Sequence, residues 1–252
     1  GDAYAGGWGI LSEMAVLNEG AIDVDVTAGS ATGDAVTVSA VGVGIEAAGD
    51  VNNVGDLTIT VQGGSGTGGT VDGATNAAGM IYGLDEVTDV NNSGDLVVSA
   101  TGGMSSGTDV NDAAFALGAE VLGAITNSGA VDVSASGGEA AGTLSGAAYA
   151  EVSGLDAGMD LTNSGAVEVS ATGGVASGPS ADAHADAIAL DAGGSIENDA
   201  AITASATGGT ADANDNDAEA WADATGLYSE DAVTNTGIVT VTATGGTADA
   251  ND

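Results

Sequence analysis

The sequence predicts an all-β fold, a parallel β-solenoid of seven repeats of about 36 residues with one three-strand coil per repeat. Two observations predict it: a corner motif containing Asn recurs along the whole chain, and a segment of alternating apolar and polar residues follows each copy. One repeat cannot bury its apolar side alone, whereas stacked repeats form a continuous core. We therefore expect residues 1–252 to be a single repeat domain, one unit of a longer array or filament.

Each repeat is anchored by an asparagine that is usually followed two residues later by glycine. The spacings between anchors are 35, 39, 35, 36, 35 and 37 residues. Asn and Gly both favour tight turns, so each anchor marks a corner of the coil. The anchors are Asn18, Asn53, Asn92, Asn127, Asn163, Asn198 and Asn235.

The first predicted strand of each repeat spans the fourth to the ninth residue after its anchor. The fourth, sixth and eighth residues are apolar in every repeat, as in Leu57, Ile59 and Val61, and the residues between them are polar except for Val97. A period of two with one polar side is typical of a half-buried strand. Six of these seven segments run into Gly-Gly, which predicts a second corner.

A variable stretch follows Gly-Gly and leads into a second alternating segment whose inward residues are mostly Ala, as at positions 181–189. A third, shorter strand carries an aliphatic residue two positions before each anchor. We expect a Gly followed by an apolar residue to close the Ala-rich segment, at Gly9–Ile10, Gly44–Ile45, Gly83–Leu84, Gly118–Ala119, Gly154–Leu155 and Gly226–Leu227.

The chain is a polyanion with 37 acidic residues and no Lys or Arg. Nucleic acids and anionic membranes are bound chiefly through Lys and Arg, so neither is an expected partner. No apolar stretch is long enough to span a bilayer, and we expect no membrane insertion. The sequence begins without an export leader, which is expected of a processed product or an excerpt. Cys is absent, so the fold uses no disulfide bond.

The run from Ala224 to Tyr228, followed by Val233 to Gly237, pairs a Gly-Leu strand with an Asn-Thr-Gly corner. This pattern resembles the β-helical passenger regions of bacterial autotransporter and haemagglutinin-like surface adhesins, and it covers essentially the whole chain. The lack of Lys and Arg departs from the usual pattern of that family. The resemblance implies secretion and an extracellular or cell-surface location.

The motif Asp-x-Asn-Asp occurs three times. Carboxylate and amide oxygens suit calcium, so calcium is the candidate cofactor. The glycine of an EF-hand loop and the nonapeptide of calcium-binding solenoids are missing, and a solvated acidic loop is the alternative. The candidate calcium ligands are Asp109, Asn111, Asp112, Asp212, Asn214, Asp215, Asp249, Asn251 and Asp252.

Aromatic residues recur at one outward position, fourteen residues before the anchor. Tyr149, His184 and Trp221 occupy it in successive repeats, and Tyr4 occupies it in the first. Stacked copies would continue this column as an aromatic ladder that supports assembly; scattered surface aromatics are the alternative.

The sequence predicts that the protein is not an enzyme. Its acidic residues are spread along every repeat, whereas a glycosidase needs two carboxylates set apart in one cleft. A lyase usually needs a basic residue, and the single histidine, His184, is expected to be exposed to solvent.

These observations predict a non-enzymatic extracellular structural protein that forms a fibre, filament or sheath by end-to-end stacking, with further copies of itself as partner. Two alternatives remain. One is a surface adhesin stalk that presents its loops to a glycan or protein, and the other is a calcium-binding repeat protein.

Overall fold

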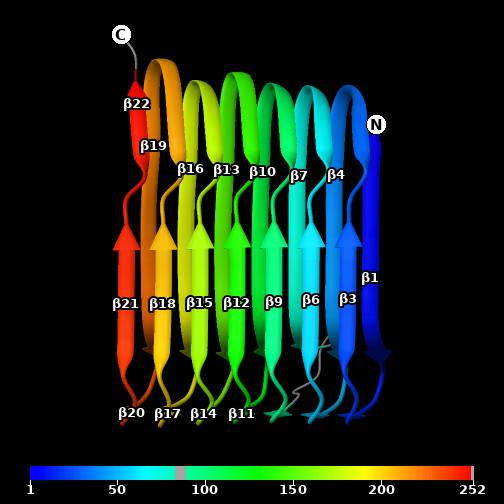
Figure 1. Ribbon diagram of the computed structural model, residues 1–252, viewed down its shortest axis with the longest axis vertical. Helices are drawn as coiled ribbons and strands as arrows, with labels where there is room; N and C mark the ends of the chain where they lie inside the picture. Colours follow the sequence, from blue (N-terminus) through cyan, green and yellow to red (C-terminus); the bar gives the residue numbers. More distant parts are fainter. Residues whose placement is uncertain (83–88, 251–252) are drawn as a thin grey trace.

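The computed structural model describes residues 1–82 and 89–250. Its strands form one eight-stranded and two seven-stranded parallel sheets, each built from equivalent strands of successive coils. Figure 1 shows the coils side by side, with the chain advancing in one direction from the N-terminus to the C-terminus. The described part of the chain contains no helix, and therefore none that is long and apolar enough to cross a membrane. The predicted parallel β-solenoid is confirmed.

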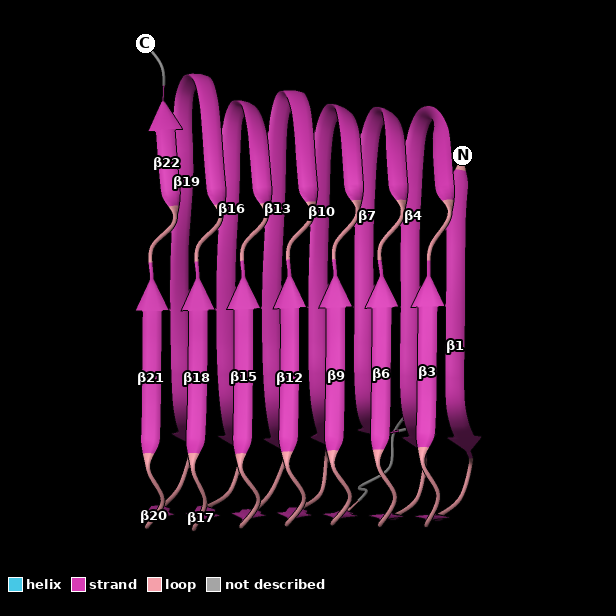
Figure 2. Cartoon of the chain, in the orientation of Figure 1, coloured by secondary structure: helices cyan, strands magenta, loops and turns pink. Residues whose placement is uncertain are grey.

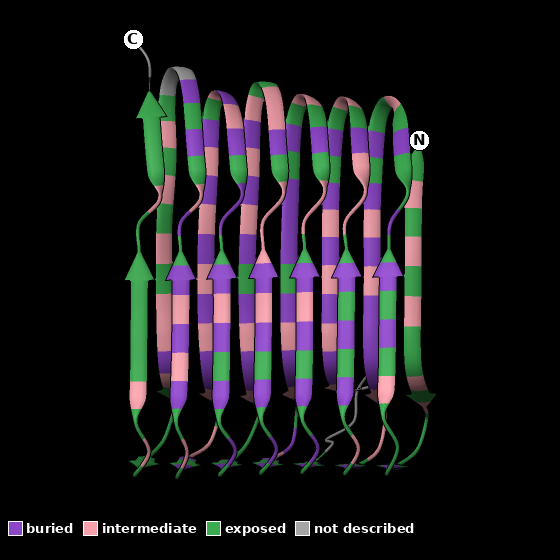
Figure 3. Ribbon diagram, viewed as in Figure 1, coloured by how far each residue is buried: buried purple, intermediate pink, exposed green. Residues whose placement is uncertain are grey.

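The first predicted strand of each repeat forms a six-residue strand with the predicted bounds. Its apolar residues point inward: Leu57, Ile59 and Val61 are buried, and the polar residues between them are exposed. Figure 3 shows this alternation along the front sheet. The six-residue strands are β3 (Ile22–Thr27), β6 (Leu57–Gln62), β9 (Leu96–Thr101), β12 (Val131–Ser136), β15 (Val167–Thr172), β18 (Ile202–Thr207) and β21 (Val239–Thr244).

The variable stretch after Gly-Gly is part of a long strand. From β4 to β19, each long strand starts directly after Gly-Gly or its equivalent, arches over one edge of the molecule and returns along the back (Figure 1). Strand β1 begins opposite Thr37, in the returning part, and β22 ends before the arch. Its inward residues are the predicted small ones, and Ala181 to Ala189 at alternate positions are buried. The long strands are β1 (Asp2–Ser12), β4 (Ser30–Ala47), β7 (Ser65–Tyr82), β10 (Met104–Val121), β13 (Glu139–Ala157), β16 (Val175–Ala192), β19 (Thr210–Ser229) and β22 (Thr247–Ala250).

A three-residue strand ending at the anchor closes each coil, at the lower edge in Figure 2. Each pairs in parallel with the equivalent strand of the next coil, so that one repeat forms one coil, as predicted. These strands are β2 (Val16–Asn18), β5 (Val51–Asn53), β8 (Val90–Asn92), β11 (Ile125–Asn127), β14 (Leu161–Asn163), β17 (Ile196–Asn198) and β20 (Val233–Asn235).

The expectation that a Gly-apolar pair closes the Ala-rich segment is wrong. Strand β4 continues three residues beyond Gly44, to Ala47. What changes at Gly44 is the inward side: positions 36, 38 and 40 are buried before it, and Ile45 and Ala47 after it. A Cβ atom at Gly44 would lie 2.5 Å from the carbonyl oxygen of Gly79 in the next coil. The glycine therefore permits close packing of backbone where the strand reverses its inward side.

The same expectation also chose the wrong pair in the third repeat. Gly83–Leu84 lies outside the described residues, and the register places Gly79–Met80 opposite Gly44–Ile45. Four extra residues cause the error, because residues 83–89 separate the long strand from the next anchor strand where residues 48–50 do so one coil earlier. In the sixth coil Ala189–Leu190 takes the equivalent place, so a methyl group is accommodated there.

The anchor asparagines form a hydrogen-bonded ladder inside the solenoid. Asn127 Nδ2 donates to Asn163 Oδ1 at 2.8 Å and to the carbonyl oxygen of Gly129 at 2.9 Å, while its Oδ1 accepts from Asn92 Nδ2 at 2.8 Å. The same donation runs in one direction through every step from Asn18 to Asn235, at 2.7 to 2.8 Å. The buried amides thereby satisfy one another.

We predict that Asn127→Ala destabilises the fold by about 2 to 4 kcal/mol, because it leaves Asn163 Oδ1 and the carbonyl oxygen of Gly129 without their side-chain donor and removes one of the two acceptors of Asn92 Nδ2. Asn235→Ala is the matched control: this anchor is exposed, and its loss should cost about 1 kcal/mol. Urea unfolding followed by circular dichroism measures both. Equal and small effects would show that the ladder contributes nothing.

Candidate functional site

The outward face of the eight-stranded sheet carries an aromatic cluster. Tyr149, His184 and Trp221 are in register on β13, β16 and β19. The ring centroids of Tyr149 and His184 are 5.0 Å apart, and those of His184 and Trp221 are 4.3 Å apart in an edge-to-face arrangement. Tyr4 lies in the same column on β1, but Ser39 and two alanines separate it from Tyr149. Aromatic contact thus spans three coils.

His184 is not the solvent-exposed residue that its outward position predicted. Its side chain is only 14% exposed, because Tyr149 and Trp221 from the neighbouring coils flank the imidazole. Neither Nδ1 nor Nε2 has a hydrogen-bond partner among the described residues. The position of the ring is therefore set by aromatic packing, and its nitrogens remain available to other groups.

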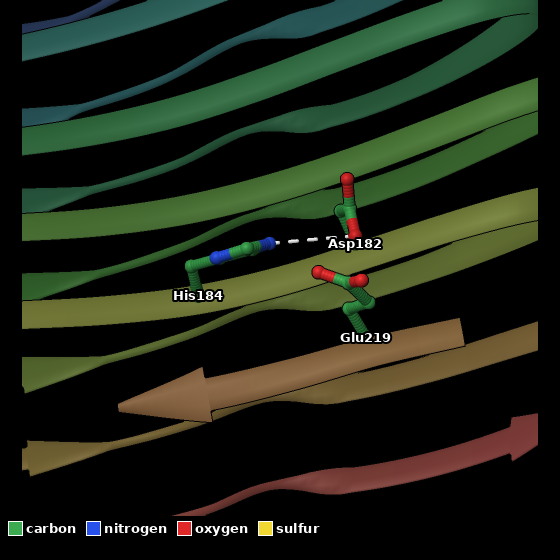
Figure 4. A group of neighbouring side chains, drawn as sticks. All are labelled: Asp182, His184 and Glu219. Atoms are coloured by element: carbon green, nitrogen blue, oxygen red, sulfur yellow. Dashed lines mark ion pairs between the residues drawn. The ribbon is translucent and has the colours of Figure 1, made fainter. Parts of the chain in front are cut away.

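Two carboxylates lie beside the imidazole (Figure 4). Asp182 precedes His184 by two residues on β16, and its Oδ1 is 3.4 Å from His184 Nε2. Glu219 stands opposite Asp182 on β19. One ligand atom from each of the three side chains lies within 4.8 Å of the other two. Sequence reasoning missed this cluster because 35 residues separate Glu219 from His184, and only the coil register joins them.

The charge of Asp182 also acts on Tyr149. The pKa of the phenol is raised, chiefly by burial and additionally by Asp182. The phenol therefore stays neutral at physiological pH.

The first Asp-x-Asn-Asp motif does not converge on one point. Asp112 points inward and is buried, whereas Asp109 and Asn111 point outward and are exposed. Consecutive strand residues face opposite sides, so a motif on one strand is divided between core and solvent. Asp109 Oδ1 accepts from Ser145 Oγ at 3.1 Å, and Asn111 Nδ2 donates to an Asp72 carboxylate oxygen at 3.3 Å.

The other two motifs are described only in part. Asp212 and Asp249 are exposed and stand in register on β19 and β22, so two carboxylates of adjacent coils lie side by side. The side chains of Asn214 and Asp215, and the whole of Asn251 and Asp252, lie outside the described residues.

Asp112 is a carboxyl group inside the core. Its Oδ1 accepts from the backbone N–H of Gly103 and its Oδ2 from Ser105 Oγ, both at 3.0 Å. Burial raises its pKa from 3.8 to about 6, and the charge of Asp72 adds to the shift, although the two hydrogen bonds oppose it. Burial outweighs the hydrogen bonds, so the Asp112 carboxyl binds a proton more tightly in the folded protein than in the unfolded chain.

A shallow groove of about 510 Å³ crosses the outward face of the long strands. Its apolar surface comes from side chains of three neighbouring coils, and carboxylates line part of it. The residues that line this groove include Val43, Phe115, Leu117, Glu120, Glu151 and Asp156.

The groove carboxylates belong to acidic columns. Glu120, Asp156 and Asp191 are in register on successive coils, and Glu151 is in register with Asp186. Burial raises the pKa of Asp156 to about 6, with further increases from Asp191 and Glu120. The pKa of Glu151 is raised by burial and by Asp186. Stacking like charges along a column thus disfavours their ionisation.

We predict that the protein becomes less stable as the pH rises from about 4 to 6. Asp112 and Asp156 have raised pKa values in the folded state, so in this range the folded state binds more protons than the unfolded state. Asp112→Asn should flatten this dependence and stabilise the protein at pH 8 by about 2 to 3 kcal/mol.

Urea unfolding at pH 5 and pH 8 checks this expectation, with Asp109→Asn as the control because that carboxylate is exposed. An Asp112→Asn variant with the wild-type pH dependence, or one less stable than wild type at pH 8, would contradict the account of the buried carboxyl.

No protein-family model, no curated protein and no solved structure matches the chain.

Proposed function

We propose that the chain is a segment of a non-enzymatic extracellular structural protein whose coils stack end to end into a fibre, filament or sheath. The observation that carries the proposal is the parallel stacking of equivalent strands in all three sheets, because a coil of this kind presents to a further coil the surface by which it binds its neighbour. Val241 on β21 is 46% exposed, whereas its register partner Ala204 on β18 is fully buried. Figure 3 shows β21 as largely exposed where the equivalent strands alternate.

The two ends of the asparagine ladder are complementary, which supports head-to-tail stacking. At the first coil, Asn18 Oδ1 is the acceptor that no preceding Asn uses. Among the described residues it accepts only from the N–H of Gly20, at 3.3 Å. Asn235 Nδ2 is the donor end and donates to the carbonyl oxygen of Gly237. Joining Asn235 Nδ2 to Asn18 Oδ1 of a following unit repeats the step already made six times. Such a contact does not close on itself and generates a filament.

A second copy would cover this surface with a coil of the same pattern. The column of Tyr4, Tyr149, His184 and Trp221 would continue across such a junction, because Tyr4 and Trp221 stand towards opposite ends of it. An extracellular site of action follows from the resemblance to autotransporter and haemagglutinin-like adhesins. With no basic side chain to neutralise 37 acidic ones, assembly requires salt or bound cations to screen the repulsion between copies.

We predict that the purified 252-residue chain forms unbranched filaments as ionic strength rises, seen by negative-stain electron microscopy and light scattering. Val241→Asp should abolish them, because it places a charge on the core surface that the next coil covers. Thr242→Asp is the matched control: it adds the same charge on the same strand but on the outward side, and should leave assembly intact.

Wild-type protein that stays monomeric at every salt concentration contradicts the fibre proposal. Equal loss of filaments in both variants would show that added charge, not the core surface, controls assembly.

A surface adhesin stalk is the second candidate, and the groove favours it. Phe115 and Leu117 offer an apolar surface, and Glu151 and Asp156 offer acceptors for hydroxyl groups. Ligand sites combine a largely apolar lining with a few polar groups in this way. Assembly without any other partner supports the fibre, whereas a monomer that binds a glycan or protein through the groove supports the adhesin.

A further inference from the structure

We propose that Asp182, His184 and Glu219 bind a divalent transition-metal ion, with Zn²⁺ as the ion that fits the donor set. One imidazole nitrogen and two carboxylate oxygens are ligands that zinc accepts, and with three protein ligands one position stays open to water. The proposal is independent of end-to-end stacking, because all three ligands lie within two adjacent coils of one chain.

The strand geometry places the three donors on one side. Asp182 and His184 are two residues apart on β16, so both project from the outward face. The parallel pairing of β16 and β19 sets Glu219 directly opposite Asp182. Figure 4 shows the imidazole directed at the Asp182 carboxylate, with the Glu219 carboxylate beside both.

The distances suit a small metal ion. Ligands about 2.0 to 2.2 Å from a tetrahedral zinc lie about 3.3 to 3.6 Å from one another. His184 Nε2 and Asp182 Oδ1 already have this separation, at 3.4 Å. All three ligand atoms lie within 4.8 Å of one another, and rotation of the longer Glu219 side chain closes the remaining gap.

The imidazole is held in place before any ion arrives. Tyr149 packs against one side of the ring and Trp221 against the other. Both ring nitrogens are buried and lack hydrogen-bond partners among the described residues, which is unfavourable unless another group satisfies them. A metal ion on Nε2 supplies that partner and neutralises two carboxylates.

The imidazole separates this cluster from the many acidic positions of the chain. Calcium takes six to eight oxygen ligands, whereas nitrogen donors favour zinc and its neighbours. His184 is the only histidine in the sequence. A selective transition-metal site involving an imidazole can therefore form only here.

Isothermal titration of the whole chain with ZnCl₂, in a large excess of Ca²⁺ that occupies diffuse acidic sites, tests the proposal. We expect one zinc ion per chain to bind under these conditions. His184→Ala and Glu219→Gln should each weaken binding by about 100-fold. Glu168→Gln, which removes an exposed carboxylate on β15, should leave the affinity unchanged.

The single imidazole also gives a direct signal, because its nuclear magnetic resonances belong to His184 alone and zinc should shift them. Zinc binding that Ca²⁺ abolishes, or that Glu168→Gln weakens as much as Glu219→Gln, would overturn the site and indicate a counterion cloud. Resonances of His184 that zinc leaves unchanged would overturn the site as well. Circular dichroism and thermal melting of each variant exclude loss of the fold as the cause.

Discussion

In-register parallel pairing between equivalent strands of successive coils is the constraint on which the rest of this structure depends. Each backbone strand hydrogen-bonds to the strand one repeat away, in all three sheets. Every side chain therefore meets the residue at the same repeat position in the next coil. Aliphatic residues form continuous inner columns, and the buried Asn side chains can satisfy one another because each finds another Asn beside it.

The same constraint brings like charges together on the outer face, which destabilises the fold because the chain has no basic residue to neutralise them. Acidic side chains at one repeat position stack into columns, such as Glu120, Asp156 and Asp191. The pKa values of Asp156 and Asp191 rise through burial and through repulsion from neighbouring carboxylates. Protons, salt and bound cations thus become part of the energetics of the fold and of any assembly built from it. The proposed zinc site is one place where the register adds an imidazole to such acidic side chains.

Local periodicity was sufficient to predict the elements in which one residue type repeats at fixed spacing. The six-residue strands and the anchor strands have the predicted positions, because alternation and the Asn corner are properties of single segments. The Gly-apolar pairs were misread because Gly44 changes the inward side within a strand, which neighbouring residues do not reveal. The four extra residues between Tyr82 and Val90 then displaced the assignment in the third repeat.

Features that depend on contacts between coils could not be read from one segment. His184 is covered by residues of the coils on either side, and Glu219 joins it only through the register. The motif at Asp109 appeared to be one ligand group, but the strand geometry divides it between solvent and core. The sequence signal for the cluster of Asp182, His184 and Glu219 was an outward Asp and His two residues apart, with an acidic residue at the position of Asp182 one repeat later.

Disulfide formation between introduced cysteines tests the coil register most directly, because the chain contains no cysteine of its own. Ser134 and Ser170 are register partners on β12 and β15, and Ser205 lies one coil further on β18. Adjacent coils place Cα atoms about 4.8 Å apart, within reach of a disulfide, whereas two coils place them about 9.6 Å apart, beyond it. The register predicts rapid intramolecular cross-linking of Ser134→Cys with Ser170→Cys and none of Ser134→Cys with Ser205→Cys. Cross-linking of the second pair, or failure of the first, would contradict it.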